Sequence, residues 1–540
     1  MCGILAIIGE GKDKAIAKQI SKRMGHRGPD ESDLHCTEKG HILSHERLSI
    51  IDLHTGKQPI QGTATAWMVH NGEIYNHEEL RNTLLKKHTF RTHSDSEVIV
   101  HLYEEFGYDF CNKLDGVFAF VVIDGDDYIA GRDPIGIKPL YYGKDKEGRM
   151  YFASEMKTIA DQCIEFAAFP PGHFYTPKTG FVRYYEPEWF DDEAATGELD
   201  IAKLREALIT ATKKRLMSDV PLGVLLSGGL DSSLTSAIAS RLLEGTGQKL
   251  HSFSIGLDKD APDLIAARKV ADYLGTEHHE LYFTVEDGIR IIEKLIWHLE
   301  TYDVTSIRAS TPMYFMSKAI TDLGIKVVLS GEGADEIFGG YLYFRNAPST
   351  EDFQRETIDR VQKLATADCL RADKSTMAHG LEARVPFLDK EFLEIAMSIN
   401  PYHKRPDTYE GREKYILRKA FDTPERPFLP EEVLWRQKEQ FSDGVGYNWI
   451  DTLIEYCAAQ VTDEQLASAA SKYPINTPAT KEAYYYREIF HKHFPQDSAA
   501  LTVKKWIPKW QENPDPSGRA NAAHVKADTT IAHKHTKIAI

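Results

Sequence analysis

The sequence has little cysteine and no surplus of basic residues. Its 540 residues include 6 cysteines, at positions 2, 36, 111, 163, 369 and 457, and none of them forms a C-x-x-C pair. This spacing excludes a dense disulfide framework and favours a reducing compartment. The formal net charge is -16 at pH 7, which argues against a general nucleic-acid surface. The composition favours small molecules as partners.

Long hydrophobic runs and internal repeats are also missing. The apolar run after Cys2 is too short to span a bilayer and has no basic segment before it. A charged, amphipathic stretch follows at residues 12–24, and no later run is long enough for a membrane helix. We therefore expect a protein that is cytoplasmic and has no membrane partner.

A change of pattern near residue 185 divides the chain. Before it, short alternating strands such as AWMVHNGEIY and GVFAFVVIDG mix with a few helices, as in an α+β domain. After it, helical periodicity is interrupted by buried runs such as GVLLS and IKVVLS, which predict a doubly wound parallel sheet. We expect domains at 2–185 and 200–510, an acidic linker at 186–199, and a flexible tail at 511–540 whose histidines are solvated.

Cys2 stands directly ahead of the first apolar run. Removal of Met1 would give Cys2 both a thiol and a free α-amine. The amine titrates near pH ~8 and the thiol near ~8.5, so the amine can serve as the base for its own thiol. This position predicts a nucleophile. The alternative interpretation is a buried, apolar cysteine in an edge strand.

Two glycine-rich loops follow buried strands in the second half. In GVLLSGGLDSS the loop runs into a helix, where backbone N–H groups and serine hydroxyls can hold an anion, although the Walker pattern is absent. In GEGADEIFGG, Glu332, Asp335 and Glu336 follow the strand KVVLS. Because ligands bind at the carboxyl ends of parallel strands, we expect the loops to meet. Asp231 beside a phosphate requires a bridging cation such as Mg²⁺. The alternative is a pair of ordinary Gly-Gly turns.

The loop SGGLDSS resembles the pyrophosphate loop of ATP pyrophosphatases, which cleave ATP between its α- and β-phosphates. With the N-terminal CGI, the chain resembles glutamine-hydrolysing asparagine synthetases over nearly its whole length. The motifs that carry this resemblance are HRGPD, SHERLSIID, NGEIYNH, GRDPIGIKPLYYG, FASEMK, ETYDVTSIRASTPMY, SGEGADEIFGGY, LEARVPFLD and WRQKEQFSDGVGY. The family implies an α/β protein in which an N-terminal-nucleophile αββα sandwich precedes an ATP-pyrophosphatase domain.

By this resemblance, the first domain is a glutaminase. Cys2 attacks the side-chain amide of glutamine and passes through a thioester. Asn71 and Gly72 supply the oxyanion hole, although Asn-Gly is also a strong signal for a hairpin turn. Arg47 pairs with the carboxylate of glutamine and Asp95 receives its ammonium, although each alone is typical of a surface ion pair. The other positions that match the family's glutamine site are Leu48, Ser49, Ile50, Ile51 and Glu73.

The resemblance also implies an ATP site in the second domain. Its residues are Leu225, Ser227, Gly228, Gly229, Asp231, Ser232, Ser233, Ile255, Ser330 and Gly331. Asp231 and Asp335 are assigned to Mg²⁺, with helix N-cap acids as the alternative. Glu332 and Lys438 are assigned to catalysis. Weaker candidates for binding aspartate or pyrophosphate are Arg308, Tyr341 and Arg384, and a salt bridge is the alternative for Arg384.

The expected activity is therefore that of a ligase with glutamine as the amido donor. Aspartate, ATP and glutamine would give asparagine, AMP, pyrophosphate and glutamate, through released ammonia and a β-aspartyl-AMP intermediate. The expected partners are these small molecules, without nucleic acid, and a homodimer is compatible with the sequence. The alternatives are a related synthetase with another acceptor, such as a β-lactam synthetase, and a non-catalytic sensor of amino acids or nucleotides.

Overall fold

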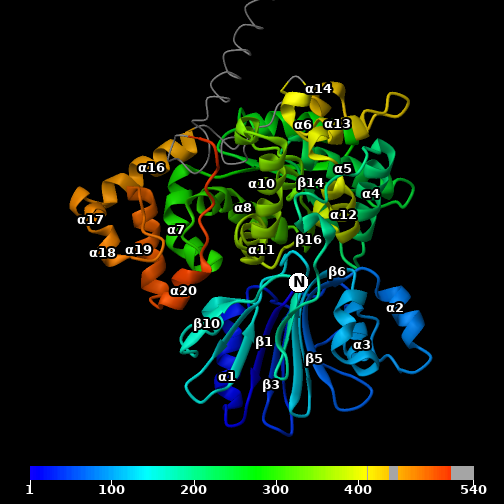
Figure 1. Cartoon of the computed structure of the whole chain (residues 1–540), viewed down its shortest axis with the longest axis vertical. Coiled ribbons are helices and arrows are strands. Elements are labelled where there is room, and N and C mark those ends of the chain that lie inside the picture. The colour runs from blue at the N-terminus through cyan, green and yellow to red at the C-terminus, as the bar shows by residue number, and fades with distance from the viewer. Residues whose placement is uncertain (410, 437–447, 512–540) are drawn as a thin grey trace, which may run out of the picture.

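The computed structural model describes residues 1–409, 411–436 and 448–511. In this part of the chain, the first domain consists of two six-stranded antiparallel sheets stacked face to face (Figure 1). The strands of the first sheet, in spatial order, are β10 (Glu165–Ala168), β8 (Tyr141–Lys144), β9 (Met150–Ala153), β1 (Gly3–Ile8), β3 (Ile42–Arg47) and β2 (Glu31–Cys36). Those of the second are β12 (Gly180–Arg183), β11 (His173–Thr176), β7 (Asp127–Arg132), β6 (Gly116–Asp124), β5 (Trp67–Ile74) and β4 (Ile60–Gln61).

Strand β1 shows why the two sheets stack. Its residues are all buried, because both faces of the strand are covered. Ile4, Ala6 and Ile8 belong to the apolar cluster between the sheets, whereas Leu5 and Ile7 belong to the cluster on the opposite face. The alternation follows from the two-residue period of a strand. A strand that is covered on both faces is therefore apolar at nearly every position.

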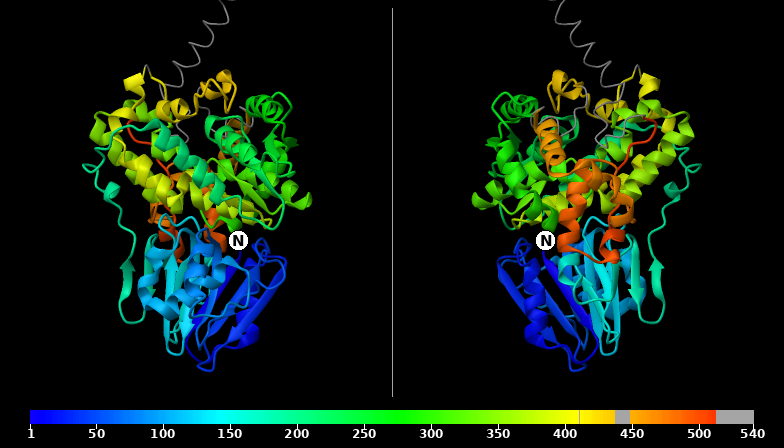
Figure 2. Two further views of the ribbon diagram at one scale, coloured as in Figure 1. Left: turned by 90° about the vertical axis from the view of Figure 1, so that its right-hand side faces the viewer. Right: turned by 90° about the vertical axis from the view of Figure 1, so that its left-hand side faces the viewer.

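Helices cover the outer face of each sheet. Helix α1 (Lys14–Ser21) packs on β1 and β3, while α3 (Val98–Phe106) packs on β5 and contacts α2 (His77–Leu84). The layers seen from the side in Figure 2 are thus helix, sheet, sheet and helix. This arrangement is the αββα sandwich expected from the sequence.

The second domain is built around a five-stranded parallel sheet, in the order β15 (Glu277–Tyr282), β14 (His251–Gly256), β13 (Leu222–Leu225), β16 (Val327–Leu329), β17 (Glu382–Arg384). All four neighbouring strand pairs are parallel. Its larger helices are α4 (Ile201–Lys214), α5 (Leu230–Leu243), α6 (Pro262–Leu274), α7 (Val285–Leu299), α8 (Val304–Asp322), α10 (Thr350–Lys363), α11 (Asp368–Met377) and α12 (Lys390–Ser398). The expected doubly wound fold is confirmed.

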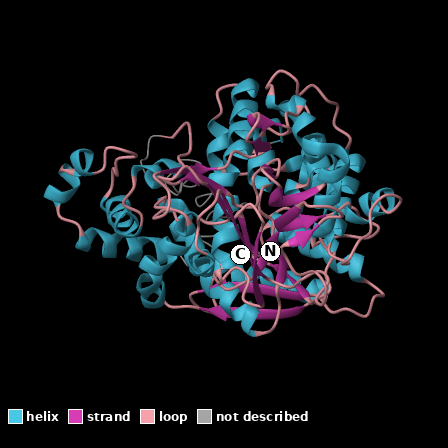
Figure 3. Ribbon diagram, turned by 90° about the horizontal axis from the view of Figure 1, so that it is seen from below, coloured by secondary structure: helices cyan, strands magenta, loops and turns pink. Residues whose placement is uncertain are grey.

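Shorter and later helices complete the second domain. They are α9 (Ala334–Phe338), α13 (Tyr415–Phe421), α14 (Glu431–Leu434), α16 (Asn448–Gln460), α17 (Asp463–Ala467), α18 (Ala469–Lys472), α19 (Lys481–His493) and α20 (Asp497–Thr502). Viewed from the side of the first domain, helices α16 to α19 extend to one side of the strands (Figure 3). Among the described residues, we find no helix with the length and hydropathy of a membrane span.

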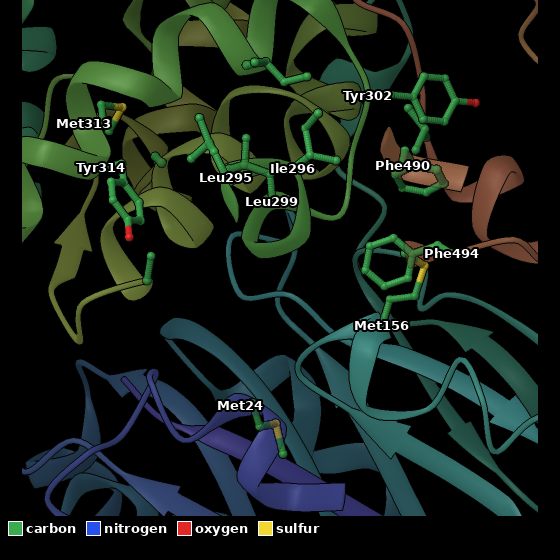
Figure 4. Packing of buried hydrophobic residues seen from close by; sticks show 14 of the residues in the cluster. Met24, Met156, Leu295, Ile296, Leu299, Tyr302, Met313, Tyr314, Phe490 and Phe494 are labelled. Carbon is green, nitrogen blue, oxygen red and sulfur yellow. The ribbon is translucent and has the colours of Figure 1, made fainter. Parts of the chain in front are cut away.

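One apolar cluster passes through both domains. It includes Met24 and Met156 of the first domain together with Leu295 of α7, Met313 of α8 and Phe490 of α19 (Figure 4). Buried ion pairs cross the same boundary: Arg27 contacts Asp373 of α11 at 2.8 Å. The two domains therefore share packing and buried charges at their interface.

Candidate active sites

Cys2 directly precedes β1, and the N-terminus of the chain lies between the two domains (Figure 1). Its backbone N–H donates to Oδ1 of Asn71 at 2.8 Å, and its Sγ lies 3.9 Å from the backbone oxygen of Leu48. Burial raises the pKa of the thiol, while the Met1 amine, the contact with Leu48 and the Arg47 guanidinium act in the opposite direction. The thiol is therefore shielded from solvent and has cationic groups close by.

Asn71 and Gly72 lie inside strand β5 (Trp67–Ile74) and pair with Ala119 and Phe118 of β6. The hairpin-turn interpretation of this Asn-Gly pair is therefore wrong. Gly72 has φ +149°, and a Cβ at this position would lie 1.9 Å from the backbone oxygen of Val117, so only glycine fits. The side-chain nitrogen of Asn71 is buried and has no hydrogen-bond partner among the described residues. It is a donor available to a ligand beside Cys2.

The two predicted anchors for glutamine are both buried. Arg47 pairs with Glu31 at 2.7 Å and donates to the backbone oxygen of Asp52 at 2.6 Å. Asp95 accepts from the backbone N–H of Ile74 at 2.8 Å, and burial raises the pKa of its carboxyl group. Neither residue is the exposed ion-pair member that the alternative interpretation proposed.

The other predicted glutamine-binding positions face the second domain. Met1, Leu48 and Ile50 pack in one apolar cluster with Leu222 and Val224 of β13. Ser49 and Ile51 lie in the same loop after β3. The loop follows β3 of the first domain and packs against β13 of the second. Its backbone is therefore held in place next to Cys2.

The Met1 amine lies in a buried group of charges at this boundary. It pairs with Glu382 of β17 at 2.6 Å. Arg384 pairs with the same Glu382 and lies 3.3 Å from Glu73. Burial and the nearby Glu382 raise the pKa of Glu73 well above its ordinary value. Charges from both domains therefore meet at the N-terminus of the chain, beside Cys2.

The second site is a cavity of about 190 Å³ at the carboxyl ends of the parallel strands. The predicted residues that line it are Leu225, Ser227, Gly229, Asp231, Ser232, Ile255, Ser330, Gly331, Glu332, Asp335 and Tyr341. The two glycine-rich loops lie against each other, as expected. A Cβ on Gly331 would come within 2.8 Å of the backbone nitrogen of Ser232.

Charged side chains of both signs face each other in this cavity. Lys414 lies between the predicted metal ligands, with its Nζ 2.5 Å from the carboxylates of both Asp231 and Asp335. Glu332 pairs with Arg371 at 2.9 Å, and Arg371 also pairs with Asp368 at 2.6 Å. The carboxylates thus converge on shared cations.

Some predicted residues lie elsewhere. Arg384 is not among the described residues that line the cavity; it is buried in the ion pairs with Glu382 and Glu73, so the salt-bridge alternative describes it correctly. Arg308 likewise lies outside the cavity lining and forms a two-point pair with Glu482, at 2.9 and 2.6 Å. Lys438 falls outside the described residues.

Two loop residues support the cavity without lining it. Gly228 has φ +74°, and a Cβ there would lie 2.5 Å from the side chain of Ala266, so its role is to let the loop pass close to α6. Ser233 points into the protein and is fully buried in α5. Neither is among the residues that line the cavity.

Sequence reasoning missed several residues that line the cavity. They are Asp263, Asp368, Arg371, Lys414, Arg418, Arg436 and Trp506. Arg371 and Asp368 stand three residues apart in the polar stretch DCLRADK, where the density of charge in a helix is the available signal. Nothing local distinguishes this stretch from a solvated helix surface, because its burial depends on tertiary packing.

A buried cysteine at the start of an αββα sandwich, joined to a cavity beside glycine-rich loops of a parallel sheet, is the arrangement of a two-domain amidotransferase. Residues 1–179 match the family model described as glutamine amidotransferase domain, and residues 203–352 and 345–514 match the model described as asparagine synthase. The chain belongs to the asparagine synthase family. It is 52% identical to a glutamine-hydrolyzing asparagine synthetase from Zea mays, covering 98% of this chain and 94% of that one.

Two further relatives agree with this assignment. The glutamine-hydrolyzing asparagine synthetase 2 of Arabidopsis thaliana is 54% identical, over 98% of this chain and 96% of its own length. A probable glutamine-hydrolyzing asparagine synthetase of Dictyostelium discoideum is 52% identical, over 97% and 99%. The similarity therefore extends across both domains.

Proposed function

We propose that this chain makes asparagine from aspartate, glutamine and ATP, and releases glutamate, AMP and pyrophosphate. The observation that carries the proposal is the presence of two complementary sites in one member of the asparagine synthase family. One site holds Cys2 beside Asn71, and the other holds a phosphate loop beside Glu332. The first has the groups for releasing ammonia and the second has the groups for activating an acceptor.

In the first domain, Cys2 acts on glutamine after removal of Met1. The α-amine of Cys2 takes the thiol proton, and Sγ forms a bond to the amide carbon of the substrate. The amide nitrogen then leaves as ammonia, and water cleaves the thioester to give glutamate. The Asn71 side-chain N–H and the Gly72 backbone N–H stabilise the oxyanion in this proposal, supported by the unpartnered Asn71 nitrogen.

Arg47 and Asp95 select free glutamine in this scheme. The guanidinium of Arg47 is held in place by Glu31 and by the Asp52 backbone, so it is oriented before the substrate carboxylate arrives. Asp95 is fixed by the Ile74 N–H and offers its remaining oxygen to the substrate ammonium. The backbone of Leu48, Ser49, Ile50 and Ile51, together with Glu73, forms the rest of the proposed pocket.

In the second domain, the side-chain carboxylate of aspartate attacks the α-phosphorus of ATP. This step forms β-aspartyl-AMP and breaks the bond to pyrophosphate, and ammonia then displaces AMP. In this scheme Ser227, Gly229, Asp231 and Ser232 face the phosphates, Ile255 lies by the adenine, and Ser330 and Gly331 close the site, while Gly228 and Ser233 support the loop from behind. Glu332, oriented by Arg371, assists formation of the adenylate, with Lys438 as a second proposed catalytic residue.

The carboxylates of Asp231 and Asp335 fit a magnesium ion. Both reach the same point, now marked by the Lys414 ammonium, and Oδ1 of Asp231 is buried with no hydrogen-bond partner among the described residues. Carboxylate oxygens next to phosphates are the ligands that Mg²⁺ takes in nucleotide sites. When bound, the ion would neutralise charge on the departing pyrophosphate.

Other expectations from the sequence remain proposals. They are the domain limits 2–185 and 200–510 with a linker at 186–199, a homodimer, and a cytoplasmic location. Sedimentation and cell fractionation would test the last two. Of the predicted tail at 511–540, residues 512–540 lie outside the described residues.

Measurement of pyrophosphate release with different acceptors tests the proposed reaction. The full-length protein is incubated with ATP, Mg²⁺ and ammonium, and with aspartate or a β-amino acid as the acceptor. We expect release to require aspartate. Release with the β-amino acid alone would favour the β-lactam type of synthetase, and no release with either would favour a non-catalytic sensor.

A further inference from the structure

A compact cluster of histidine and glutamate side chains lies in the first domain, apart from the residues assigned to glutamine. His101 and Glu104 lie on α3, and His88 follows α2. Oε2 of Glu104 is 3.1 Å from Nδ1 of His101 and 3.3 Å from Nδ1 of His88. The Thr63 hydroxyl lies 3.1 Å from Nδ1 of His88 and 3.5 Å from Nδ1 of His101. Four potential ligand atoms therefore lie close together, and those of His88, His101 and Glu104 are all within 4.8 Å of one another.

The separations of 3.1–3.5 Å from Glu104 and Thr63 to the two rings are close to the spacing of ligands around a tetrahedral metal ion. With metal–ligand distances of about 2.0–2.1 Å, neighbouring ligand atoms in a tetrahedron lie about 3.3–3.4 Å apart. Without a metal, two ring nitrogens and a carboxylate oxygen would all be hydrogen-bond acceptors in contact with each other, unless the ring nitrogens carried protons. A divalent cation removes this repulsion with one ion and leaves both rings neutral.

The outer nitrogens of the two rings also have carboxylates nearby. Nε2 of His101 is 3.5 Å from Glu97, and Nε2 of His88 is 3.6 Å from Glu105. Neither nitrogen has a hydrogen-bond partner among the described residues. A carboxylate behind the far nitrogen is the usual support of a metal-bound histidine, because it fixes the ring and the position of its proton.

The cluster is sheltered and negatively charged. The side chains of His101, His88 and Glu104 are 1%, 8% and 11% exposed, so water competes little for the ligand atoms. The backbone N–H of Ala64 donates to Oε1 of Glu104 at 3.0 Å, which fixes the carboxylate so that Oε2 faces the two rings. The Glu104 carboxylate is therefore positioned to bind a cation together with the two rings.

We propose that His88, His101 and Glu104 bind a divalent transition-metal ion, with Zn²⁺ as the best match. Two imidazoles and a carboxylate suit Zn²⁺, and the Thr63 hydroxyl or a water completes the tetrahedron. The role is structural. Glu97 binds the backbone N–H groups of Arg91 and Thr92, so the ion would fix the segment that leads to Asp95.

A second histidine cluster supplies the matched control. In the parallel sheet, Nδ1 of His251 lies 3.1 Å from Nε2 of His279, and Glu277 lies 3.9 and 4.0 Å from the two rings. The Glu277 side chain is 45% exposed and pairs with Lys249. These longer distances and the competing lysine make it the weaker cluster.

Titration of the chelator-treated, full-length protein with Co²⁺ tests the proposal. Tetrahedral Co²⁺ has intense visible absorption, and a thiolate ligand adds a separate near-ultraviolet band. We expect one tightly bound equivalent with the visible absorption and without the thiolate band. His88→Gln should remove this equivalent, His279→Gln should keep it, and Glu105→Gln should weaken the affinity about 10–100-fold. Unlabelled Zn²⁺ should displace the bound Co²⁺.

Three results would contradict the proposed metal site. Equal binding by wild type and His88→Gln, loss of the bound equivalent only in His279→Gln, or no tetrahedral Co²⁺ in wild type would each overturn the proposal. In each of those cases His88, His101 and Glu104 form only hydrogen bonds with each other and bind no metal ion. The near-ultraviolet circular dichroism of the variants must match that of the wild type, which shows that they are folded. Thr63→Ala is a second variant at the same cluster, because the Thr63 hydroxyl is the proposed fourth ligand. We expect Thr63→Ala to retain binding with altered absorption.

Discussion

The two candidate sites differ in how they are built. The glutaminase site is closed: Cys2, Asn71 and Asp95 are buried, and their polar groups are positioned by the sandwich itself. The synthetase site is an open cavity lined by carboxylates and cations from separate loops. This difference reflects the chemistry. Amide hydrolysis needs a nucleophile and fixed donors, whereas loss of pyrophosphate needs positive charge around a highly charged leaving group.

The interface between the domains limits how independent the sites are. The loop after β3 packs on β13, and Arg384 of β17 pairs with Glu73 of β5. Mutations that change charge inside one site should separate the two activities. Mutations at the shared boundary should affect both.

The largest effect is expected for Asp231→Asn. Asparagine synthesis should fall by at least about 100-fold with either glutamine or ammonium, because the carboxylate that helps to bind the cation is lost. Glutamine hydrolysis should persist, since it uses the other domain. Pyrophosphate release and glutaminase activity are measured on the same preparation, so that the second activity reports folding.

Asp335→Asn and the double variant sharpen this test. If both residues bind one ion, the double variant should be little worse than either single variant. If they only cap helices, each loss should cost about 1 kcal/mol of stability and leave catalysis intact. Near-normal pyrophosphate release by Asp231→Asn would refute the metal assignment.

Cys2→Ala should abolish the glutamine route alone. Without the thiol no thioester forms, but the adenylating cavity is unchanged, so synthesis from ammonium should continue at close to the wild-type rate. Both routes are compared by quantifying asparagine. A variant that still hydrolyses glutamine would contradict the assignment of Cys2, and intact mass of the active wild type should show that Met1 is absent.

Arg47→Lys should have a smaller, selective effect. An ammonium cannot reproduce the planar two-point contact with a carboxylate, so the KM for glutamine should rise about 10-fold or more. Synthesis from ammonium should be unchanged. Arg23→Lys is the matched control, since Arg23 forms an exposed pair with Asp161. Equal losses in both assays would show that Arg47 is structural.

The smallest effect concerns stability at acidic pH. Burial lowers the pKa of His45 and His70, in the first domain, to about 3 each. Both rings therefore stay neutral in the folded protein, whereas an unfolded chain protonates them near pH ~6.5. Stability is thus lost as pH falls below ~6.5, by up to about 1.4 kcal/mol per pH unit for each ring.

Thermal unfolding at pH 7 and pH 5 measures this effect. Between pH 7 and pH 5 the Tm should fall less for His45→Gln than for wild type. The variant lacks one of the two histidines that bind a proton in the unfolded state but not in the folded state. Replacement of the exposed His54 by Gln is the control and should leave the fall unchanged. An identical fall for wild type and His45→Gln would show that other groups determine the acid sensitivity.

Much of the architecture followed from local patterns. The alternating strands of the first domain and the buried runs of the second predicted both sheet types, because a strand's covered faces determine which residues are apolar. Asn71-Gly72 was ambiguous, since the same pair that favours a turn also fits a strand where a backbone oxygen approaches closely. Here the approach of Val117 to Gly72 decides in favour of the strand.

Long-range charge pairing was not predictable in the same way. Lys414 reaches Asp231 across 183 residues, and Arg384 pairs with Glu73 of the other domain. Such contacts depend on how distant loops pack, and their local sequences resemble ordinary polar surfaces. The sequence therefore predicted the loops that line the cavity but missed the cations Lys414 and Arg371 that balance their carboxylates.

The central claim is that nitrogen released at Cys2 is used in the second domain of the same chain. The direct measurement is mass spectrometry of the products after incubation with ATP, Mg²⁺, aspartate and glutamine carrying ¹⁵N in its side-chain amide. The account predicts ¹⁵N-asparagine together with glutamate, AMP and pyrophosphate, and none of the labelled asparagine with Cys2→Ala. Unlabelled asparagine, ADP with phosphate, or transfer of the label to another acceptor would contradict it.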